Sequence, residues 1–411
     1  MRTVWLGTSA VVAAALAATL LVAPALAGDG PGHLDPSFGD HGISVVSKAR
    51  DATESVAIGK KGRIVLAGYG TLARLRANGR LDRSFGDAGV VHLQFPGYPL
   101  DPLQVAIVPK GGIFVAGAQC PTLNDCRFAV SHLWRDGDLD RGFGDSGTAL
   151  IGFPNSDSEA SAIAITRGGD LLVGGFSCGK TCGFALTRLY RRGIVDRSFG
   201  HRGKVTGSLG DCYPGLSGMA LDSRGRIVVS ASCKGKVASL ARFKPSGAVD
   251  RSFGHRGKVT KDVFIDRVEA LAVDARNRID LAGTRANAYG VVRFGRNGKF
   301  DSSFGKHGKA RANFPVDRHV GVYDVAVDTH GRIVVAGDAS ALGFARFKRD
   351  GRVDRRFGHN GVIALAHGKG FYYASSVAID RRNRIVAGGH HRVPNSGGEE
   401  DLAAVRLLGG S

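Results

Sequence analysis

Several features that the sequence lacks already restrict the fold. No stretch after residue 27 has the 3.6-residue periodicity of an amphipathic helix, and none is long and apolar enough to cross a bilayer. Cysteine is scarce, with six in 411 residues, and acidic residues are outnumbered by basic ones, 36 against 56. We therefore expect a basic chain of strands and turns, without a membrane-spanning helix after residue 27.

The first 27 residues have the pattern of a secretory signal peptide. Arg2 precedes an apolar stretch at 4–23, and Ala25-Leu26-Ala27 supplies the small-x-small site read by signal peptidase. We predict cleavage after Ala27 and a mature chain of 28–411 that is secreted or associated with the cell envelope. A retained membrane anchor is the alternative. A lipoprotein is not expected, because no cysteine follows the cleavage site.

The predicted mature chain has a formal charge of +19, because cleavage removes Arg2 from a chain whose charge is +20. Such an excess favours contact with polyanions, and an anionic envelope polymer or glycan is the partner that we expect first. The alternative is that the charge reflects composition alone, since the basic residues are scattered and form no block. Nucleic acid is not an expected partner of an exported chain that lacks interleaved basic and aromatic residues.

One nonapeptide pattern divides the chain into repeats. VDRSFGHRG occurs at 195–203 and again at 249–257, and related segments begin at residues 34, 81, 139, 300 and 353. An aspartate, a phenylalanine and two glycines occur in all seven copies. The aspartates and phenylalanines are Asp35, Phe38, Asp82, Phe85, Asp140, Phe143, Asp196, Phe199, Asp250, Phe253, Asp301, Phe304, Asp354 and Phe357. The copies are 47 to 58 residues apart, so we expect a single domain of seven units at 28–411.

The Asp, Ser and His of this pattern do not behave as a catalytic triad. Gly142 and Arg356 replace the serine in two copies, and Asp87, Asp145 and Lys306 stand where the quoted copies have histidine. A hydrolase cannot lose its nucleophile and base. The invariant residues are those of a turn, because aspartate binds nearby backbone N–H groups, glycine permits a positive φ, and phenylalanine anchors the turn in a core.

Each unit contains two more recurring segments. One is a turn between apolar runs, as in AIGKKGRIVLAG (57–68), and the other ends in arginine and a second turn, as in FALTRLYRRG (184–193). In the first full unit they predict strands at 53–58, 63–68, 71–76 and 90–94. Seven units of four short strands predict an all-β, seven-bladed β-propeller with four-stranded blades, and a β-solenoid is the alternative.

The three motifs, in this order, resemble the delta-60 repeat of bacterial proteins over residues 34–408. The departures are Asn277 and Asn383 at a turn glycine, and His132 at a strand arginine. The resemblance implies an exported, propeller-like repeat protein and no defined activity.

The order of the motifs predicts how the ring closes. The mature chain begins with a motif and a strand at 43–47, and it ends with strands near 376–380, 384–388 and 402–407. We expect the N-terminal strand to complete the last blade, which leaves no exposed sheet edge. The arginine that precedes most motif aspartates by eight residues is expected to lie between blades and to bind that aspartate or backbone carbonyls. A solvent-exposed arginine is the alternative.

All six cysteines lie in three adjacent units. They are Cys120, Cys126, Cys178, Cys182, Cys212 and Cys233. An even number in an exported protein suggests disulfides. Propeller topology favours one disulfide within each of the two close pairs and a third between the remaining two residues, all on the face with the variable loops. A zinc site is the alternative, although the spacing fits it poorly.

The expected role is a monomeric binding or interaction scaffold outside the cell, with an unknown ligand and without cofactor or metal. The alternative is a propeller enzyme of the lyase, lactonase or glycosidase kind, with acidic residues around the central channel. The candidates for such a site are Glu54, Asp101, Glu159, Glu269 and Asp324, with tyrosines nearby. His390, His391 and Glu399 in the longest loop are metal-ligand candidates, although a solvated loop is the simpler interpretation.

Overall fold

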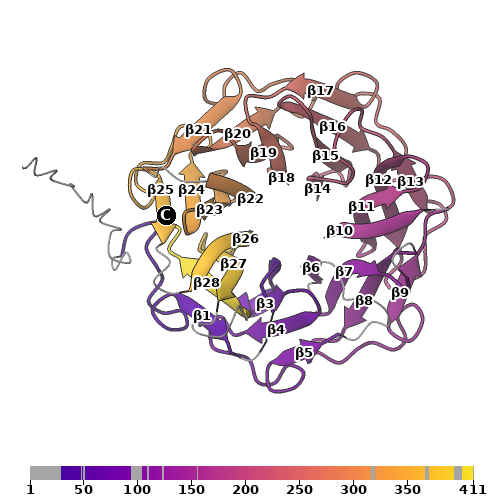
Figure 1. Cartoon of the computed structure of the whole chain (residues 1–411), viewed down its shortest axis with the longest axis horizontal. Helices are drawn as coiled ribbons and strands as arrows, with labels where there is room; N and C mark the ends of the chain where they lie inside the picture. Colours follow the sequence, from indigo (N-terminus) through magenta and orange to yellow (C-terminus); the bar gives the residue numbers. More distant parts are fainter. Residues whose placement is uncertain are drawn as a thin grey trace, which may run out of the picture.

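Seven four-stranded antiparallel sheets are arranged as the blades of a closed ring (Figure 1). This computed structural model describes residues 29–47, 49, 51–93, 104–108, 111–122, 125–154, 156–315, 320–365, 370–392 and 400–410. The predicted all-β, seven-bladed propeller is confirmed. In these ranges the one helix is a 3-10 turn, η1 (Lys60–Gly62), and no helix has the length and apolar character to cross a membrane.

Each blade has an inner, a second, a third and an outer strand. The inner strands are β2 (Ser55–Ile58), β6 (Gln104–Ile107), β10 (Asp157–Ile165), β14 (Gly218–Leu221), β18 (Arg267–Val273), β22 (Val320–Val327) and β26 (Phe371–Ile379). The second strands are β3 (Ile64–Ala67), β7 (Ile113–Gln119), β11 (Leu171–Cys178), β15 (Ile227–Cys233), β19 (Ile279–Thr284), β23 (Ile333–Ala339) and β27 (Ile385–Arg392). The third strands are β4 (Thr71–Leu75), β8 (Arg127–Leu133), β12 (Cys182–Leu189), β16 (Val237–Phe243), β20 (Ala288–Phe294), β24 (Leu342–Phe347) and β28 (Glu400–Leu407). The outer strands are β5 (Val90–His92), β9 (Thr148–Ile151), β13 (Lys204–Gly207), β17 (Lys258–Asp262), β21 (Lys309–Asn313), β25 (Val362–Leu365) and β1 (Ile43–Val46).

The core lies between the blades. The second and third strands are buried on both faces, as in β3 and β4, where every residue is buried. Their continuous apolar sequences suit strands that are covered on both sides. Each hydrophobic cluster combines two neighbouring blades, as where Phe38 and Val46 of the closing blade pack with Ile64 and Leu66 of blade 1. A blade therefore has no complete core of its own.

The ring closes as the sequence predicted. The N-terminal strand β1 pairs antiparallel with β28, with Ile43 opposite Val405, and so completes the blade of β26, β27 and β28 (Figure 1). Arg406 in β28 binds the N-terminal motif, with its Nε 2.8 Å from Asp35 Oδ2. The two ends of the described chain are therefore joined by a strand pair and a buried ion pair.

Every motif is fixed by the same set of contacts. In five blades the third-strand arginine binds the motif aspartate at Nε–Oδ2 distances of 2.7 to 2.9 Å, which confirms the predicted pairing: Arg74–Asp82, Arg188–Asp196, Arg242–Asp250, Arg346–Asp354 and Arg406–Asp35. The guanidinium also lies over the motif phenylalanine, as for Arg74 over Phe85 at 4.6 Å. Burial alone raises the pKa of Asp82, but hydrogen bonds from Ser84 and the charge of Arg74 lower that pKa to about 2.

The same motifs join each blade to the next. The N–H of the first motif glycine donates to a carbonyl in the following blade in all seven cases, as from Gly86 to Asp136 at 2.6 Å. The arginine often does the same, as from Arg188 Nη1 to the Pro245 carbonyl at 2.6 Å. Since glycine at this position has φ near +55° and its Cβ would meet backbone within 3 Å, both the donor and the residue type are needed.

Two blades depart from the pattern. In blade 2, His132 replaces the arginine and still binds Asp140, with Nδ1 2.9 Å from Oδ2. In blade 5, Arg293 binds Asp280 at 2.7 and 3.0 Å instead of the motif Asp301. Its Nη1 donates to the Arg349 carbonyl at 2.7 Å, so the backbone carbonyl is the predicted kind of partner that is confirmed here. Asp280 lies directly opposite Arg293 in the β19–β20 register, so a cross-strand carboxylate replaces that of the motif.

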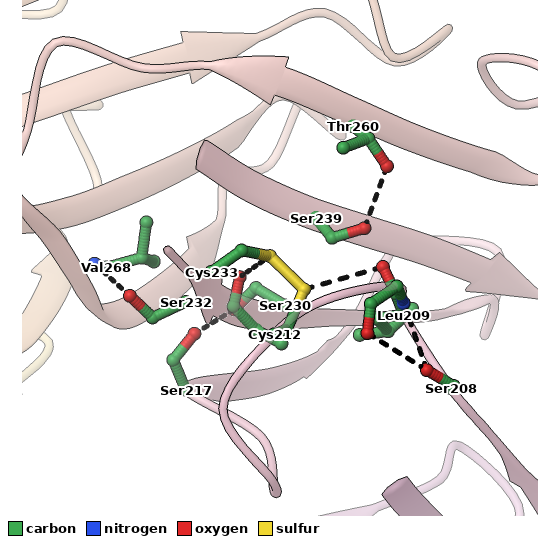
Figure 2. The surroundings of a disulfide bond; sticks show 12 residues. Ser208, Leu209, Cys212, Ser217, Ser230, Ser232, Cys233, Ser239, Thr260 and Val268 are labelled. Atoms are coloured by element: carbon green, nitrogen blue, oxygen red, sulfur yellow. Dashed lines mark hydrogen bonds between the residues drawn. A yellow bond between two sulfur atoms is a disulfide. The ribbon is translucent and has the colours of Figure 1, made fainter. Parts of the chain in front are cut away.

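The three predicted disulfides are confirmed. They are Cys120–Cys126, Cys178–Cys182 and Cys212–Cys233, and no described cysteine is free. Figure 2 shows the third, which ties the segment before β14 to the end of β15 beside Ser232, whose Oγ accepts the Val268 N–H of the next blade. Three disulfides indicate an oxidising, extracytoplasmic environment.

The buried ion pair of blade 5 gives a prediction for stability. Arg293→Leu leaves Asp280 charged and unpaired where both side chains are fully buried, so the free energy of unfolding should fall by about 3–5 kcal/mol. Adding Asp280→Leu removes the isolated charge and should recover most of this loss. Denaturant unfolding measures both, with Arg311→Leu on the exposed outer strand as control. A double variant as unstable as the single one would contradict the prediction.

Candidate functional sites on the two faces of the ring

Antiparallel blades place alternate connections on opposite faces. The loop face carries the turns between second and third strands, with the disulfides and the starts of the inner strands. The motif face carries the turns between inner and second strands, together with the Phe-Gly motifs. Each face holds a candidate site.

On the loop face, His390 lies between two carboxylates at the junction of the closing blade and blade 1. Its Nε2 is 2.7 Å from Glu54 Oε1, just before β2, and its Nδ1 is 2.9 Å from Glu400 Oε2 at the start of β28. Burial alone lowers the pKa of His390, but the bonds and charges of Glu54 and Glu400 outweigh it and raise that pKa above 6.5. The two carboxylates therefore favour the protonated imidazole, which has a donor on each nitrogen and, in that form, no lone pair for a metal ion or for proton abstraction.

Tyrosines surround this cluster. Tyr373 on β26 stacks on the imidazole at 4.3 Å, its hydroxyl lies 2.8 Å from His390 Nε2, and Tyr323 on β22 lies 4.8 Å from the Tyr373 ring. Tyr69, in the turn between β3 and β4, is 44% exposed, and burial together with Glu54 raises its pKa to about 12. The cluster is therefore a group of polar and aromatic side chains contributed by three neighbouring blades.

The predicted channel-mouth carboxylates have different surroundings where the structure describes them. Glu54 belongs to the His390 cluster. Glu269 on β18 binds Arg267 at 2.8 Å, and Asp324 on β22 accepts the Val377 N–H of the next blade at 2.7 Å. Glu159 lies on β10, two residues before a β-bulge, and Asp101 is outside the described residues. Glu54, Glu269 and Asp324 therefore each bind a different partner.

Bulges at the starts of the inner strands explain why some of these side chains project from the blades. The registers shift between Ala160 and Ala162, Val268 and Ala270, and Val322 and Asp324, so that Ser161, Glu269 and Tyr323 are extra residues. A bulge redirects a side chain out of the alternating pattern. The sequence predicted that Glu159, Glu269 and Asp324 lie at the starts of the inner strands. It did not predict the extra residue that each of these strands contains.

Two of the metal-ligand candidates lie in a strand, and not in the solvated loop that the sequence suggested. His390 is at the end of strand β27 with only 11% of its side chain exposed, and His391 follows it on the same strand. Glu399 lies outside the described residues. Within the described ranges, no group of three His, Cys, Asp or Glu side chains is arranged to hold a metal ion. Sequence reasoning missed Glu400, which the pairing of β27 with β28 brings to His390, and Tyr69, which lies beside Glu54.

On the motif face, two adjoining hollows each carry several basic side chains among apolar and polar residues. The first, of about 890 Å³, is lined by residues of blades 7, 1 and 2, among them Lys60, Lys61, Arg381 and Arg382. The second, of about 700 Å³, shares Lys60 and Lys61 and adds Arg63 and Arg135. Asp380 in the first hollow is already bound by Arg384 at 2.7 Å. Basic residues that are far apart in the sequence are therefore brought together at these hollows.

Comparison with known proteins identifies the fold. Residues 62–85 and 331–357 match a family described as a domain of unknown function (DUF5122) beta-propeller. No curated protein matches the chain. Virginiamycin B lyase from Staphylococcus aureus, a catalytically inactive variant with quinupristin, is similar at a TM-score of 0.56 and 9% identity, over 89% of this chain and 98% of that one. The WD40 propeller domain of Doa1 is similar at a TM-score of 0.53 and 11% identity, over 88% and 95% of the chains.

The likeness is one of fold. At these identities the neighbours place the chain among β-propellers.

Asp324 gives a prediction for the pH dependence of stability. Burial raises its pKa from 3.8 to about 6, although three hydrogen bonds oppose the change. Between these values the folded chain binds more protons than the unfolded chain, so the free energy of unfolding falls as the pH rises, by up to about 3 kcal/mol at 1.36 kcal/mol per pKa unit. Asp324→Asn should remove this fall between pH 4 and 6, as measured by denaturant unfolding, whereas Asp350→Asn in an exposed turn should not. The same slope in both variants would contradict the assignment.

The proton on His390 is tested separately. Replacing both Glu54 and Glu400 by Gln removes the charges that raise its pKa and leaves burial, so this pKa should fall below 6.5. NMR titration of the imidazole C–H signals measures it, with the exposed His41 as internal reference. A pKa that stays above 6.5 would show that the two carboxylates do not hold the proton.

Proposed function

We propose that this protein is an exported β-propeller that binds an anionic polymer of the cell envelope or its surroundings through the motif face. The observation that carries the proposal is the gathering of exposed basic side chains around two adjoining hollows. Export is supported by the signal-peptide pattern at 1–27 and by the three disulfides. The resemblance of the motifs to the delta-60 repeat is consistent with such a role.

The arrangement of these basic residues suits a long ligand. Lys60 and Lys61 come from blade 1, Arg381 and Arg382 from blade 7, and Arg135 from blade 2, and all five are exposed. Carried by turns of a rigid ring, they present several positive charges along one arc. A polymer that crosses the arc makes several ionic contacts at once, which a small anion cannot do.

Binding is a better conclusion than catalysis. Among the described residues, Glu269 and Asp324 are committed to Arg267 and to backbone donors, and both nitrogens of His390 contact carboxylates. Acid–base catalysis needs a pair of groups that face a common substrate, one of them free to take a proton. The loop-face cluster is better explained as a junction between blades.

The proposal is tested by co-sedimentation of residues 28–411 with isolated cell-envelope polymers across a salt series. Binding should weaken steeply with salt, because exposed charges are screened. Changing Lys60, Lys61, Arg381 and Arg382 to Glu should weaken binding by about tenfold to a hundredfold, since each exposed ionic contact contributes up to about 1 kcal/mol.

A second variant controls for net charge. Changing Arg83, Arg141, Arg197 and Arg251 to Glu alters the charge equally at exposed motif residues that line neither hollow. This variant should keep most of the binding. An equal loss of binding in both variants would show that binding depends on the net charge of the protein and not on the two hollows. Absence of binding at low salt would overturn the proposal.

A further inference from the structure

The turn between the inner and second strands of blade 1 departs from its counterparts in blades 4 to 7. In blades 4 to 7 this five-residue turn begins with aspartate and ends with arginine, at 222–226, 274–278, 328–332 and 380–384. Blade 1 has Gly59 and Arg63 at these two positions. In all five turns the first N–H donates to the fifth carbonyl at 2.7 to 3.0 Å, so the residues correspond one to one.

In blades 4 to 7 the aspartate carboxylate is held as a bound anion would be. Asp222 Oδ1 accepts the backbone N–H groups of Arg224 and Arg226 at 2.8 and 2.9 Å, and its Oδ2 accepts from Arg226 Nε at 2.6 Å. The same three bonds recur at Asp274, Asp328 and Asp380. The repeat therefore builds the same set of contacts to a carboxylate four times.

Blade 1 keeps the basic residues of this arrangement and lacks the carboxylate. Gly59 has no side chain, and the turn carries Lys60, Lys61 and Arg63 without an acidic residue. Arg63 is 49% exposed, against 12% to 20% for the corresponding arginines, and its Nε contacts Asp82 at 3.2 Å instead. Lys61 has a left-handed φ of 64°, unlike the third residue of the other four turns. The charge of this turn is thus not neutralised from within.

The position where the carboxylate is missing lies at the meeting point of the two basic hollows. Gly59, Lys60 and Lys61 line both hollows, and the first hollow continues to Arg381 and Arg382 of the neighbouring blade. A ligand therefore has access and space at the place where the other turns hold their own anion.

We propose that the turn 59–63, with Arg381 and Arg382, is a specific site for one oxyanion group, a carboxylate or a phosphate. The ligand oxygens take the place of the aspartate carboxylate of the other turns, and the lysine and arginine side chains supply the charge. This inference rests on the proposed function and deepens it, because it names the chemical group by which an anionic polymer is held and the point at which it is held. Charge-assisted hydrogen bonds to carboxylate and phosphate are the strong ones in proteins, which suits a single anchoring group within a long ligand.

The repeat itself supplies the decisive variant, Gly59→Asp, which restores the carboxylate of the other turns. Gly59 has φ −90° and ψ −174°, an extended conformation open to any residue. The atoms nearest to an added Cβ would be two in the flexible side chain of Ile107, at 3.3 and 3.4 Å, and the Arg63 carbonyl oxygen at 3.7 Å. The variant should therefore fold and melt close to the parent protein. Gly59→Asn is the matched control, with nearly the same size and no charge.

Binding to two defined polymers, polyphosphate and polygalacturonate, measures the effect and distinguishes the sources of the oxyanion. Gly59→Asp should bind at least tenfold more weakly than the parent protein to whichever polymer the site prefers, since the internal carboxylate competes for contacts of this strength. Gly59→Asn should stay within about twofold. Equal binding by Gly59→Asp and Gly59→Asn would overturn the site while leaving the proposed function intact.

Inorganic phosphate and acetate give a readout that does not depend on a polymer. Titration of either should shift the backbone amide NMR signals of residues 60–63 in the parent protein, and these shifts should be absent in Gly59→Asp. If the polymers fail to bind but these shifts appear, the proposed function is wrong and the oxyanion site stands. If the signals do not move in the parent protein, the site is overturned even when polymers bind.

Discussion

The ring depends on a buried arginine that no single blade can satisfy. In six blades the guanidinium stacks on the motif phenylalanine, binds a carboxylate, and donates to a carbonyl of the following blade, as Arg188 does with Phe199, Asp196 and Pro245. A buried guanidinium is tolerated only when its charge and its N–H groups are all matched. Because one of its partners belongs to the next blade, each blade is complete only within the closed ring.

The closing blade shows this constraint most clearly. Asp35 comes from the N-terminal motif, Arg406 from the last strand, and the Ala77 carbonyl that Arg406 also contacts belongs to blade 1. Thr53 adds hydrogen bonds in both directions with Ala403, and Glu54 adds its bond to His390. The junction is therefore held on both faces of the ring, by the arginine on the motif face and by the histidine cluster on the loop face.

This division leaves the two faces free for different purposes. On the motif face the turn aspartates of blades 4 to 7 bind the arginine of their own turn. Blade 1 has Gly59 in place of this aspartate, so the positive charges of its turn have no acidic partner within the turn. On the loop face the disulfides fix turns whose sequences vary from blade to blade. The binding surface proposed for the motif face thus arises where blade 1 departs from the self-neutralised turns of blades 4 to 7.

The sequence by itself determined the number of blades, the strand positions of the first unit to within two residues, the closure and the disulfide pairs, because these follow from repeated turns and from local order along the chain. It also indicated the arginine–aspartate pairing where the partners lie eight residues apart. The tertiary structure decided the rest. Asp280 replaces Asp301 as the partner of Arg293 because the strand register places it opposite that arginine. His390 binds Glu54 only because the ring brings the two ends of the chain together. For the same reason Arg381 and Lys60 line one hollow. Contacts between residues more than 300 positions apart depend on closure, and no local pattern in a single sequence records them.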